Sequence, residues 1–394
     1  MHALDGVRAR YDVVVVGARA AGAATAMLLA RRGLRVLAVD RGAYGTDTLS
    51  THALMRAGVL QLARWGLLDR IEAEGTPRVR RTVFHYADDV VDIPIKAKHG
   101  VPALFAPRRT VLDRVLVDAA VEAGATVRHR VRAADLVRGN AGRVEGVVLR
   151  DEDGEARDVR AGSVIGADGL RSIVATRVGA PVTRQGRHAS AVLYGYWTGL
   201  EADGYCWHWG RDVAAGTIPT NGGEVLLYAG VSSRRFVEET RSGVARAYRR
   251  ILEEASPELA GRLADARLVG TIHGFAGQSG HLRRPWGPGW ALVGDSAYFK
   301  DPITAHGISD ALRDAELLAR AVETGTDAAM AEYELARDEL SARLFDVTDR
   351  IASCDWDLSG LKALHQALSD EMKREVAALV QLHQEPGEPA RRSA

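Results

Sequence analysis

A turn rich in small residues near the N-terminus has the composition of a dinucleotide-binding loop. Gly17 and Gly22 follow the apolar stretch YDVVVV, and Asp40 ends the next apolar stretch, 40 − 17 = 23 residues after Gly17. A strand, a glycine turn and a helix present unpaired backbone N–H groups and a helix dipole to a pyrophosphate. An acidic residue at the position of Asp40 can accept hydrogen bonds from an adenosine ribose. These residues therefore predict a bound dinucleotide.

One residue of this turn departs from the usual pattern. Arg19 occupies the middle glycine position, so its side chain must turn outward or pair with the phosphates. Ala20 and Ala21 in the first helical turn, and Arg41 after Asp40, complete the expected contacts. For this segment alone, a plain strand-to-helix turn in another kind of α/β protein is the alternative.

A second group of residues follows an apolar stretch late in the chain. The segment ALVGDSAYFKDPITAHGISDALRDAELLA ends a strand at Asp295, turns at Pro302 and starts a helix near Gly307. Asp295 can hold a ribityl hydroxyl, while N–H groups at the helix start face an anion. The segment resembles the second FAD fingerprint of class A flavoprotein monooxygenases, the p-hydroxybenzoate hydroxylase family. That resemblance implies a flavin pyrimidine next to Gly307 and Ile308.

A third segment, GADGLRSIVA, resembles the middle fingerprint of the same family. The resemblance implies that Asp168 and Gly169 serve both FAD and NAD(P)H binding, although Ala175 replaces the closing arginine of the family. Arg56 and Arg109 fall where the family has further cofactor contacts. Surface positions for both arginines are the alternative.

The resemblance implies one FAD, reduced by NADH or NADPH, and a flavin hydroperoxide that hydroxylates or epoxidises a small aromatic or polycyclic molecule with molecular oxygen. In this chemistry the protein positions the substrate and excludes water. No catalytic residue is assigned. His52, His306 and Pro302 are candidates near the flavin, and a buried, hydrogen-bonded histidine is the alternative for both histidines.

Two related families carry motifs that this chain lacks. Halogenases are marked by W-x-W-x-I-P and prenyl reductases by Y-x-W-x-F-P, but the residues five and three before Pro219 are Ala214 and Gly216. We expect these small residues to enlarge the space beside the flavin ring. We expect Lys96 and Lys98 to face solvent from a strand, which leaves no halogenase-type lysine. Three alternatives stay open: a halogenase, a flavin reductase or dehydrogenase without oxygen insertion, and a non-catalytic flavin-binding relative.

The candidate substrate residues lie in the aromatic region from 189 to 277. Because strands alternate their faces, Trp207 and Trp209 point to one side of their strand, with Cys206 and His208 on the other. Together with Gly216 and Tyr228 they could line a pocket. Ordinary core packing is the alternative for each aromatic residue.

The elements that must position these residues predict an α/β fold. We expect a Rossmann-like FAD-binding domain of the glutathione-reductase type, an inserted, mainly antiparallel β-sheet domain that binds substrate, and C-terminal helices. The boundaries are 11–77, 106–185 and 285–325 for the FAD domain, 78–105 and 186–284 for the sheet domain, 326–385 for the helices and 386–394 for a disordered tail.

Composition excludes several functions. Lys and Arg number 52 against 51 Asp and Glu, with no long basic block, so we expect no nucleic-acid partner. The two cysteines, Cys206 and Cys354, exclude a disulfide framework and argue against a metal site. The sequence shows no signal peptide and no membrane span, which favours a cytoplasmic protein. The oligomeric state is left open.

Overall fold

The strand–helix–strand unit predicted at the start of the chain is present. The computed structural model describes residues 3–383, so the predicted tail 386–394 lies outside the described residues. The unit consists of β1 (Arg10–Val16), α1 (Ala20–Arg31) and β2 (Val36–Asp40). β1 and β2 are parallel. The valines of β1 are buried because both faces of the strand are covered.

β1 lies at the centre of the main sheet, which has the strand order β16-β17-β8-β1-β2-β5. β8 is parallel to β1 and β17, while its first half pairs antiparallel with β7. The other strands of this sheet are β5 (Thr126–His129), β6 (Val131–Arg138), β7 (Val144–Asp151), β8 (Ala156–Gly166), β16 (Trp286–Gly287) and β17 (Trp290–Leu292).

The stretch ATVRHRVRAADLV forms two strands, β5 and β6. Arg130 has a φ of 59°, in the left-handed region, and its N–H donates to the carbonyl oxygen of Gly42 at 3.1 Å. The chain therefore turns at Arg130. β5 continues the parallel sheet beside β2, whereas β6 pairs with β7.

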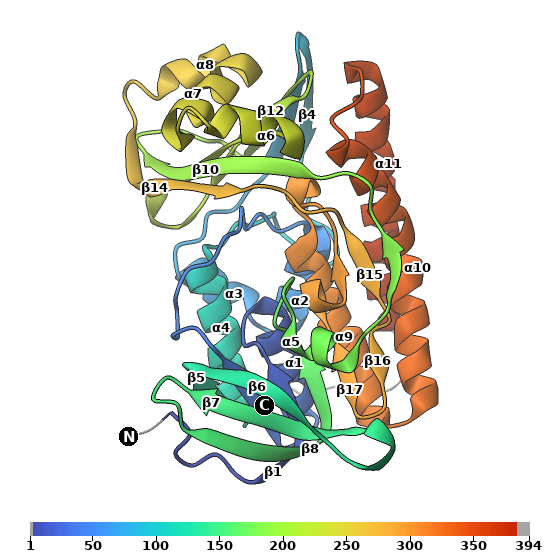
Figure 1. The fold of residues 1–394 in the computed structure, drawn as a ribbon. Helices are drawn as coiled ribbons and strands as arrows, with labels where there is room; N and C mark the ends of the chain where they lie inside the picture. The colour runs from blue at the N-terminus through green and yellow to red at the C-terminus, as the bar shows by residue number, and fades with distance from the viewer. Residues whose placement is uncertain (1–2, 384–394) are drawn as a thin grey trace.

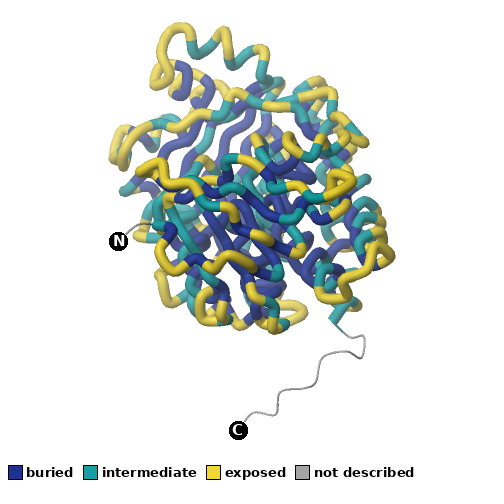
Figure 2. The backbone as a smooth tube through the Cα atoms, turned by 60° about the horizontal axis from the view of Figure 1, so that its bottom comes forward, coloured by how far each residue is buried: buried dark blue, intermediate teal, exposed yellow. Residues whose placement is uncertain are grey.

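Helices between the two sheets carry the largest core. In Figure 1, α1, α2 and α4 lie between the main sheet at the bottom and a second sheet at the top. Figure 2 shows the buried segments inside a shell of exposed loops. The helices on the main sheet are α2 (Arg56–Arg64), α3 (Leu68–Ala73), α4 (Arg109–Glu122), α5 (Ile173–Val178) and α9 (Gly307–Thr324).

The second sheet has the strand order β14-β10-β13-β12-β11-β3-β4. It is antiparallel except where β11 runs parallel to β3. Two of its strands therefore come from an early segment of the chain, and the others from the aromatic region. The strands are β3 (Arg81–Tyr86), β4 (Asp89–Pro94), β10 (Ser190–Thr198), β11 (Tyr205–Gly210), β12 (Val213–Pro219), β13 (Val225–Ser232) and β14 (Arg267–Phe275).

Three helices interrupt the aromatic region, which the sequence pattern had predicted as strands alone. They are α6 (Ser233–Thr240), α7 (Val244–Ala255) and α8 (Pro257–Arg262). α7 buries Ala247, Tyr248, Ile251 and Leu252, a helical spacing, against the outer face of the second sheet. In Figure 1 these helices cover the top of that sheet.

Two long helices follow α9 and run along one side of both sheets (Figure 1). They are α10 (Asp327–Ala352) and α11 (Leu358–Leu382). A small sheet of β9 (Val182–Gln185), β15 (His281–Arg283) and β18 (Tyr298–Phe299) lies beside them. Within residues 3–383, no helix is long and apolar enough to cross a membrane.

Candidate functional site

The three fingerprint segments meet in space. A Cβ atom on Gly17, which has a φ of +100°, would lie 2.3 Å from the carbonyl oxygen of Ala167. A Cβ atom on Gly294 would lie 2.8 Å from the Cβ of Ala21. At these distances a Cβ atom would overlap its neighbour. Gly17 and Gly294 therefore permit a close approach of the segments that a residue with a side chain would prevent. The dinucleotide turn therefore touches both other fingerprints.

The start of α1 is open to an anion. Arg19 is the N-cap residue and makes no side-chain cap hydrogen bond, so the first N–H groups of the helix have no partner among the described residues. The guanidinium group of Arg19 turns away to Asp113, at 3.1 Å, and to the carbonyl oxygen of Thr46, at 3.2 Å. Of the two positions expected for this side chain, the structure has the outward one.

Asp40 stabilises the same turn. Its Oδ2 accepts from the N–H of Ala18 at 2.8 Å, and its Oδ1 accepts from the N–H of Gly42 at 2.7 Å. Ala20 is buried at the helix start, and Arg41 is exposed beside Asp40. The carboxylate therefore lies next to the glycine turn, and its contact with a ribose stays a prediction.

Asp168 and Gly169 lie beyond the end of β8. The carboxylate of Asp168 accepts from the hydroxyl of Ser172 at 2.5 Å and from the N–H of Ile173 at 2.6 Å. Burial raises the pKa of Asp168 and outweighs these hydrogen bonds. Gly169 has a φ of +75°, which favours glycine. Asp168 thus holds the N-cap residue Ser172 and the first N–H group of α5, and its contact with NAD(P)H stays a prediction.

The side-chain carboxylate of Asp295 has no hydrogen-bond partner among residues 3–383. Burial raises its pKa to about 6, against the opposing effect of the positive charges of Arg109 and Lys300. Arg109 is itself held by Asp113, at 3.0 Å. A carboxylate that is half-buried and lacks a partner in the described part of the chain is suited to accept from a ligand hydroxyl.

The start of α9 is open in the same way as the start of α1. His306 is the N-cap residue and makes no side-chain cap hydrogen bond. Gly307 is exposed, and a Cβ atom on it would meet nothing within 4 Å, while Ile308 is partly buried. Pro302 begins the short 3-10 turn before the helix, and Ala305 adopts a left-handed conformation with a φ of 50°. Free N–H groups at this start therefore face open space.

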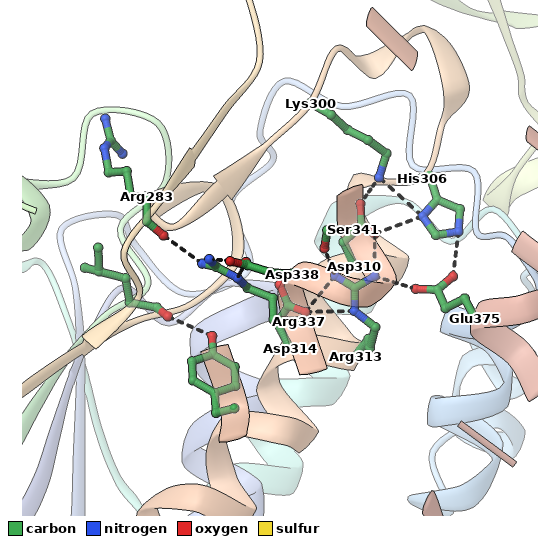
Figure 3. A network of polar contacts seen from close by, with 12 residues as sticks. Arg283, Lys300, His306, Asp310, Arg313, Asp314, Arg337, Asp338, Ser341 and Glu375 are labelled. Atoms are coloured by element: carbon green, nitrogen blue, oxygen red, sulfur yellow. Dashed lines mark hydrogen bonds and ion pairs between the residues drawn. The ribbon is translucent and has the colours of Figure 1, made fainter. Parts of the chain in front are cut away.

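A buried network of charged side chains lies behind the start of α9 (Figure 3). Lys300 pairs with Asp310, and Arg313 contacts Asp310 at 3.2 Å and Glu375 of α11 at 2.9 Å. His306 lies between Asp310, at 3.1 Å, and Glu375, at 2.9 Å. The network therefore ties the loop before α9 to the last helix.

Burial and neighbouring charges both shift the pKa values of the side chains in this network. Burial and the nearby Arg313 lower the pKa of Lys300 to about 7. Burial alone would raise the pKa of Glu375, but the charges of His306, Arg313 and Lys300 lower it to about 2. Burial lowers the pKa of His306. Glu375 is thus an ionised carboxylate on which the neighbouring cations depend.

The side chain of Arg56 has a hydrogen-bond partner within the protein. Arg56, at the start of α2, donates to the carbonyl oxygen of Lys96 at 2.9 Å, so its guanidinium holds the loop after β4. Lys96 and Lys98 are exposed in this loop rather than in a strand, because β4 ends at Pro94. Whether Arg56 also contacts a cofactor is untested.

His52 lies where the main domain meets the second sheet. It is buried, its ring stacks on Tyr196, and its Nε2 lies 3.2 Å from the hydroxyl of Tyr196. Arg108 lies over the same tyrosine ring, 3.5 Å from its centroid. Burial lowers the pKa of His52 to about 3, with the charge of Arg108 adding to the effect. The imidazole is therefore neutral at pH 7.

An apolar cavity separates the second sheet from the loop at Pro302. Trp207, Trp209 and Tyr228 line it from the sheet, and Trp356 lines it from the connection between α10 and α11. We call it the inner cavity. Its volume is about 50 Å³, so a substrate would have to displace side chains to enter.

Gly216 does not enlarge this cavity, so our expectation was wrong. A Cβ atom on Gly216 would lie 2.3 Å from the carbonyl oxygen of Cys206, 2.7 Å from the ring of Tyr228 and 3.1 Å from the ring of Trp207. The two aromatic side chains occupy the space that the small residue leaves. Gly216 therefore permits their packing.

A larger outer cavity adjoins the inner one, and Cys354 and Trp356 line both. Its volume is about 1080 Å³. Arg187, Arg211 and Arg234 line it without a side-chain partner among residues 3–383, and three aspartates balance their charge. The outer cavity is a polar approach to an apolar interior.

The donors and acceptors of this site fit FAD. The uncapped start of α1 suits a pyrophosphate, Asp295 a ribityl hydroxyl and the open start of α9 the flavin end. Fold and site together define an FAD-dependent oxidoreductase. Residues 10–348 match the family described as "FAD binding domain", and the chain belongs to that family. The family resemblance drawn from the fingerprints is thereby confirmed.

Known proteins resemble the chain over most of its length. A digeranylgeranylglycerophospholipid reductase of Methanothrix thermoacetophila is 30% identical, over 93% of both chains. The structure of the flavin-dependent brominase Bmp2 has a TM-score of 0.79 and 20% identity, covering 93% of both chains. A probable FAD-dependent monooxygenase of Pseudomonas aeruginosa, pqsL, has a TM-score of 0.73 and 19% identity, covering 92% of this chain and 100% of its own. The likeness of this chain to these two structures is a likeness of fold.

Proposed function

We propose that the protein is a monooxygenase that uses NADH or NADPH to hydroxylate or epoxidise a small aromatic or polycyclic substrate. The observation that carries this proposal is the inner cavity, which is lined by Trp207, Trp209, Tyr228 and Trp356 and adjoins Pro302. Aromatic side chains of this kind stack favourably on planar molecules. With some of these side chains displaced, the cavity would offer a planar substrate an apolar place beside the expected flavin end.

The residues of the chain would have separate roles. FAD, when bound, supplies the redox chemistry. The starts of α1 and α9 hold its negatively charged groups, and Asp295 orients its ribityl chain. The aromatic walls exclude water from the reacting atoms. His52 is neutral and buried beside Tyr196, so it supports the wall between the two domains without carrying charge.

A second candidate is a reductase that saturates a carbon–carbon double bond without oxygen. The 30% identity with a digeranylgeranylglycerophospholipid reductase favours it. Halogenation has less support, because no lysine lines either of the two cavities in the described part of the chain. Lys300, which is buried, is paired with Asp310.

The two candidates differ in their need for oxygen. FAD-loaded protein would be mixed with NADPH or NADH and a panel of planar aromatic and isoprenoid compounds. One set of reactions would be run under oxygen-18 gas and a second set without oxygen. A monooxygenase gives compound-dependent oxidation of the nicotinamide and a product that gains one labelled oxygen atom. A product that gains two hydrogen atoms without oxygen identifies the reductase and contradicts the monooxygenase.

A further inference from the structure

The outer face of the second sheet holds a group of three metal-ligating side chains. His85 on β3 and Cys206 and His208 on β11 lie together, and one ligand atom from each lies within 4.8 Å of the other two. The sulfur of Cys206 is 3.3 Å from Nε2 of His208. The rings of His85 and His208 stack with their centroids 4.2 Å apart. Among the described residues, no hydrogen bond joins this group to the residues expected to bind FAD.

The sheet itself creates the group. β3 and β11 are parallel, with His85 directly beside His208. Cys206 and His208 are separated by one residue, so both point to the same face of β11. Trp207 and Trp209 point to the opposite face, into the inner cavity. The three side chains are therefore held on one face by backbone register, without a flexible loop.

We propose that His85, Cys206 and His208 form a binding site for a borderline-soft divalent cation of the zinc type. Thiolate and imidazole are the ligands that such ions prefer, at bond lengths of about 2.3 Å to sulfur and about 2.0 Å to nitrogen. In a tetrahedral site these bonds place sulfur and nitrogen about 3.5 Å apart. The observed 3.3 Å between Cys206 and His208 is close to this value. A rotation of the His85 ring, which is half-buried, completes the three ligands.

The surroundings define how the ion would bind. No fourth histidine, cysteine or carboxylate joins the group in the described residues, so water would take the fourth position. A thiol binds such an ion as the thiolate, so binding would release the proton of Cys206. The ion would join β3 to the strand that carries two walls of the inner cavity.

Zinc stoichiometry tests the proposal. FAD-loaded protein without a histidine tag is incubated with zinc sulfate, desalted and analysed for zinc by mass spectrometry. We expect about one zinc per chain, retained by the matched controls Cys354→Ser and His273→Gln and lost in Cys206→Ser and His85→Gln. Flavin absorbance and circular dichroism show whether each variant is folded. The proposal is overturned if wild type retains no more zinc than Cys206→Ser, or if Cys354→Ser loses zinc equally.

A second measurement needs no variant. Iodoacetamide labels the two cysteines of the wild-type holoenzyme, and peptide mass spectrometry gives the rate at each. We expect zinc to slow labelling of Cys206 at least tenfold and to leave Cys354 unchanged. Equal rates at Cys206 with and without zinc would mean that the histidines and the thiol are only stacked and hydrogen-bonded.

Discussion

The indole ring of Trp356 packs edge-on against that of Trp209, with centroids 6.0 Å apart and ring planes at 76°. Trp356 comes from the connection between the last two helices, where its Nε1 donates to the carbonyl oxygen of Ile351 at 3.0 Å. Trp209 comes from the second sheet. One wall of the inner cavity is thus built by residues that are far apart in the chain.

Replacing Trp356 by alanine should open the inner cavity toward the outer one. We expect the variant to accept larger planar compounds and to bind FAD as wild type does, because neither the dinucleotide turn nor Asp295 lines the inner cavity. Nicotinamide oxidation over a size series of aromatic compounds measures the effect. Trp286→Ala, at the edge of the main sheet, is the matched control, and an unchanged size range in Trp356→Ala would remove this side chain from the substrate path.

Asp295→Ala should weaken FAD binding about tenfold to about a hundredfold. A charge-assisted hydrogen bond contributes about 1.5–3 kcal/mol, and the carboxylate has no other partner among the described residues. Fluorescence titration of FAD-free protein with FAD measures the affinity. Asp265→Ala, on an exposed turn, serves as control. Equal affinity of wild type and Asp295→Ala would contradict the assignment.

The same carboxylate should make the FAD-free protein sensitive to pH. Burial raises the pKa of Asp295 from 3.8 to about 6, so the folded state holds its proton more tightly than the unfolded state. The stability from this group is complete below pH 3.8 and is lost as pH rises through about 6. Asp295→Asn should therefore melt higher than wild type at pH 8, with a difference that shrinks toward pH 4. A difference that is constant with pH would refute this reasoning.

Glu375→Gln should destabilise the fold by about 3–5 kcal/mol, because it leaves buried cations without their partner. Urea denaturation measures the loss. The control is Glu323→Gln, since Glu323 forms an exposed pair with Arg32 and such pairs contribute about 0–1 kcal/mol. If both variants unfold at the same urea concentration, the network around Arg313 does not stabilise the protein.

Gly216→Ala should cost about 1–3 kcal/mol, because its methyl group would overlap the carbonyl oxygen of Cys206 and the rings of Tyr228 and Trp207. Gly261→Ala is the matched control, since a Cβ atom there meets nothing within 4 Å. Thermal melting of the two variants measures the difference. A Gly216→Ala protein as stable as wild type would show that the rings repack freely.

Local patterns predicted the elements that bind the dinucleotide. Gly17, Asp295 and Gly307 are recognisable because each stands at a strand or helix end with a fixed neighbourhood in sequence. The amphipathic spacing of α7 was also present in the sequence, but the aromatic residues on both sides of it favoured strands.

Other features depend on long-range packing. Lys300 and Glu375 form one network only because α11 packs near α9, and no local motif indicates that contact. The group around His85 was missed for the same reason, because only the sheet register brings His85 of β3 beside His208, two residues after Cys206. Trp356 lines the inner cavity because the connection between α10 and α11 passes beside the second sheet.

The contact of Glu375 with His306 and Arg313 also bears on synthesis. The ribosome makes β1 and its glycine turn first, and α11 near the end. Until α11 emerges, Arg313 and His306 lack this carboxylate, and the loop before α9 lacks its anchor. We therefore expect stable FAD binding only after α11 has been made, although the first fingerprint is among the earliest segments of the nascent chain.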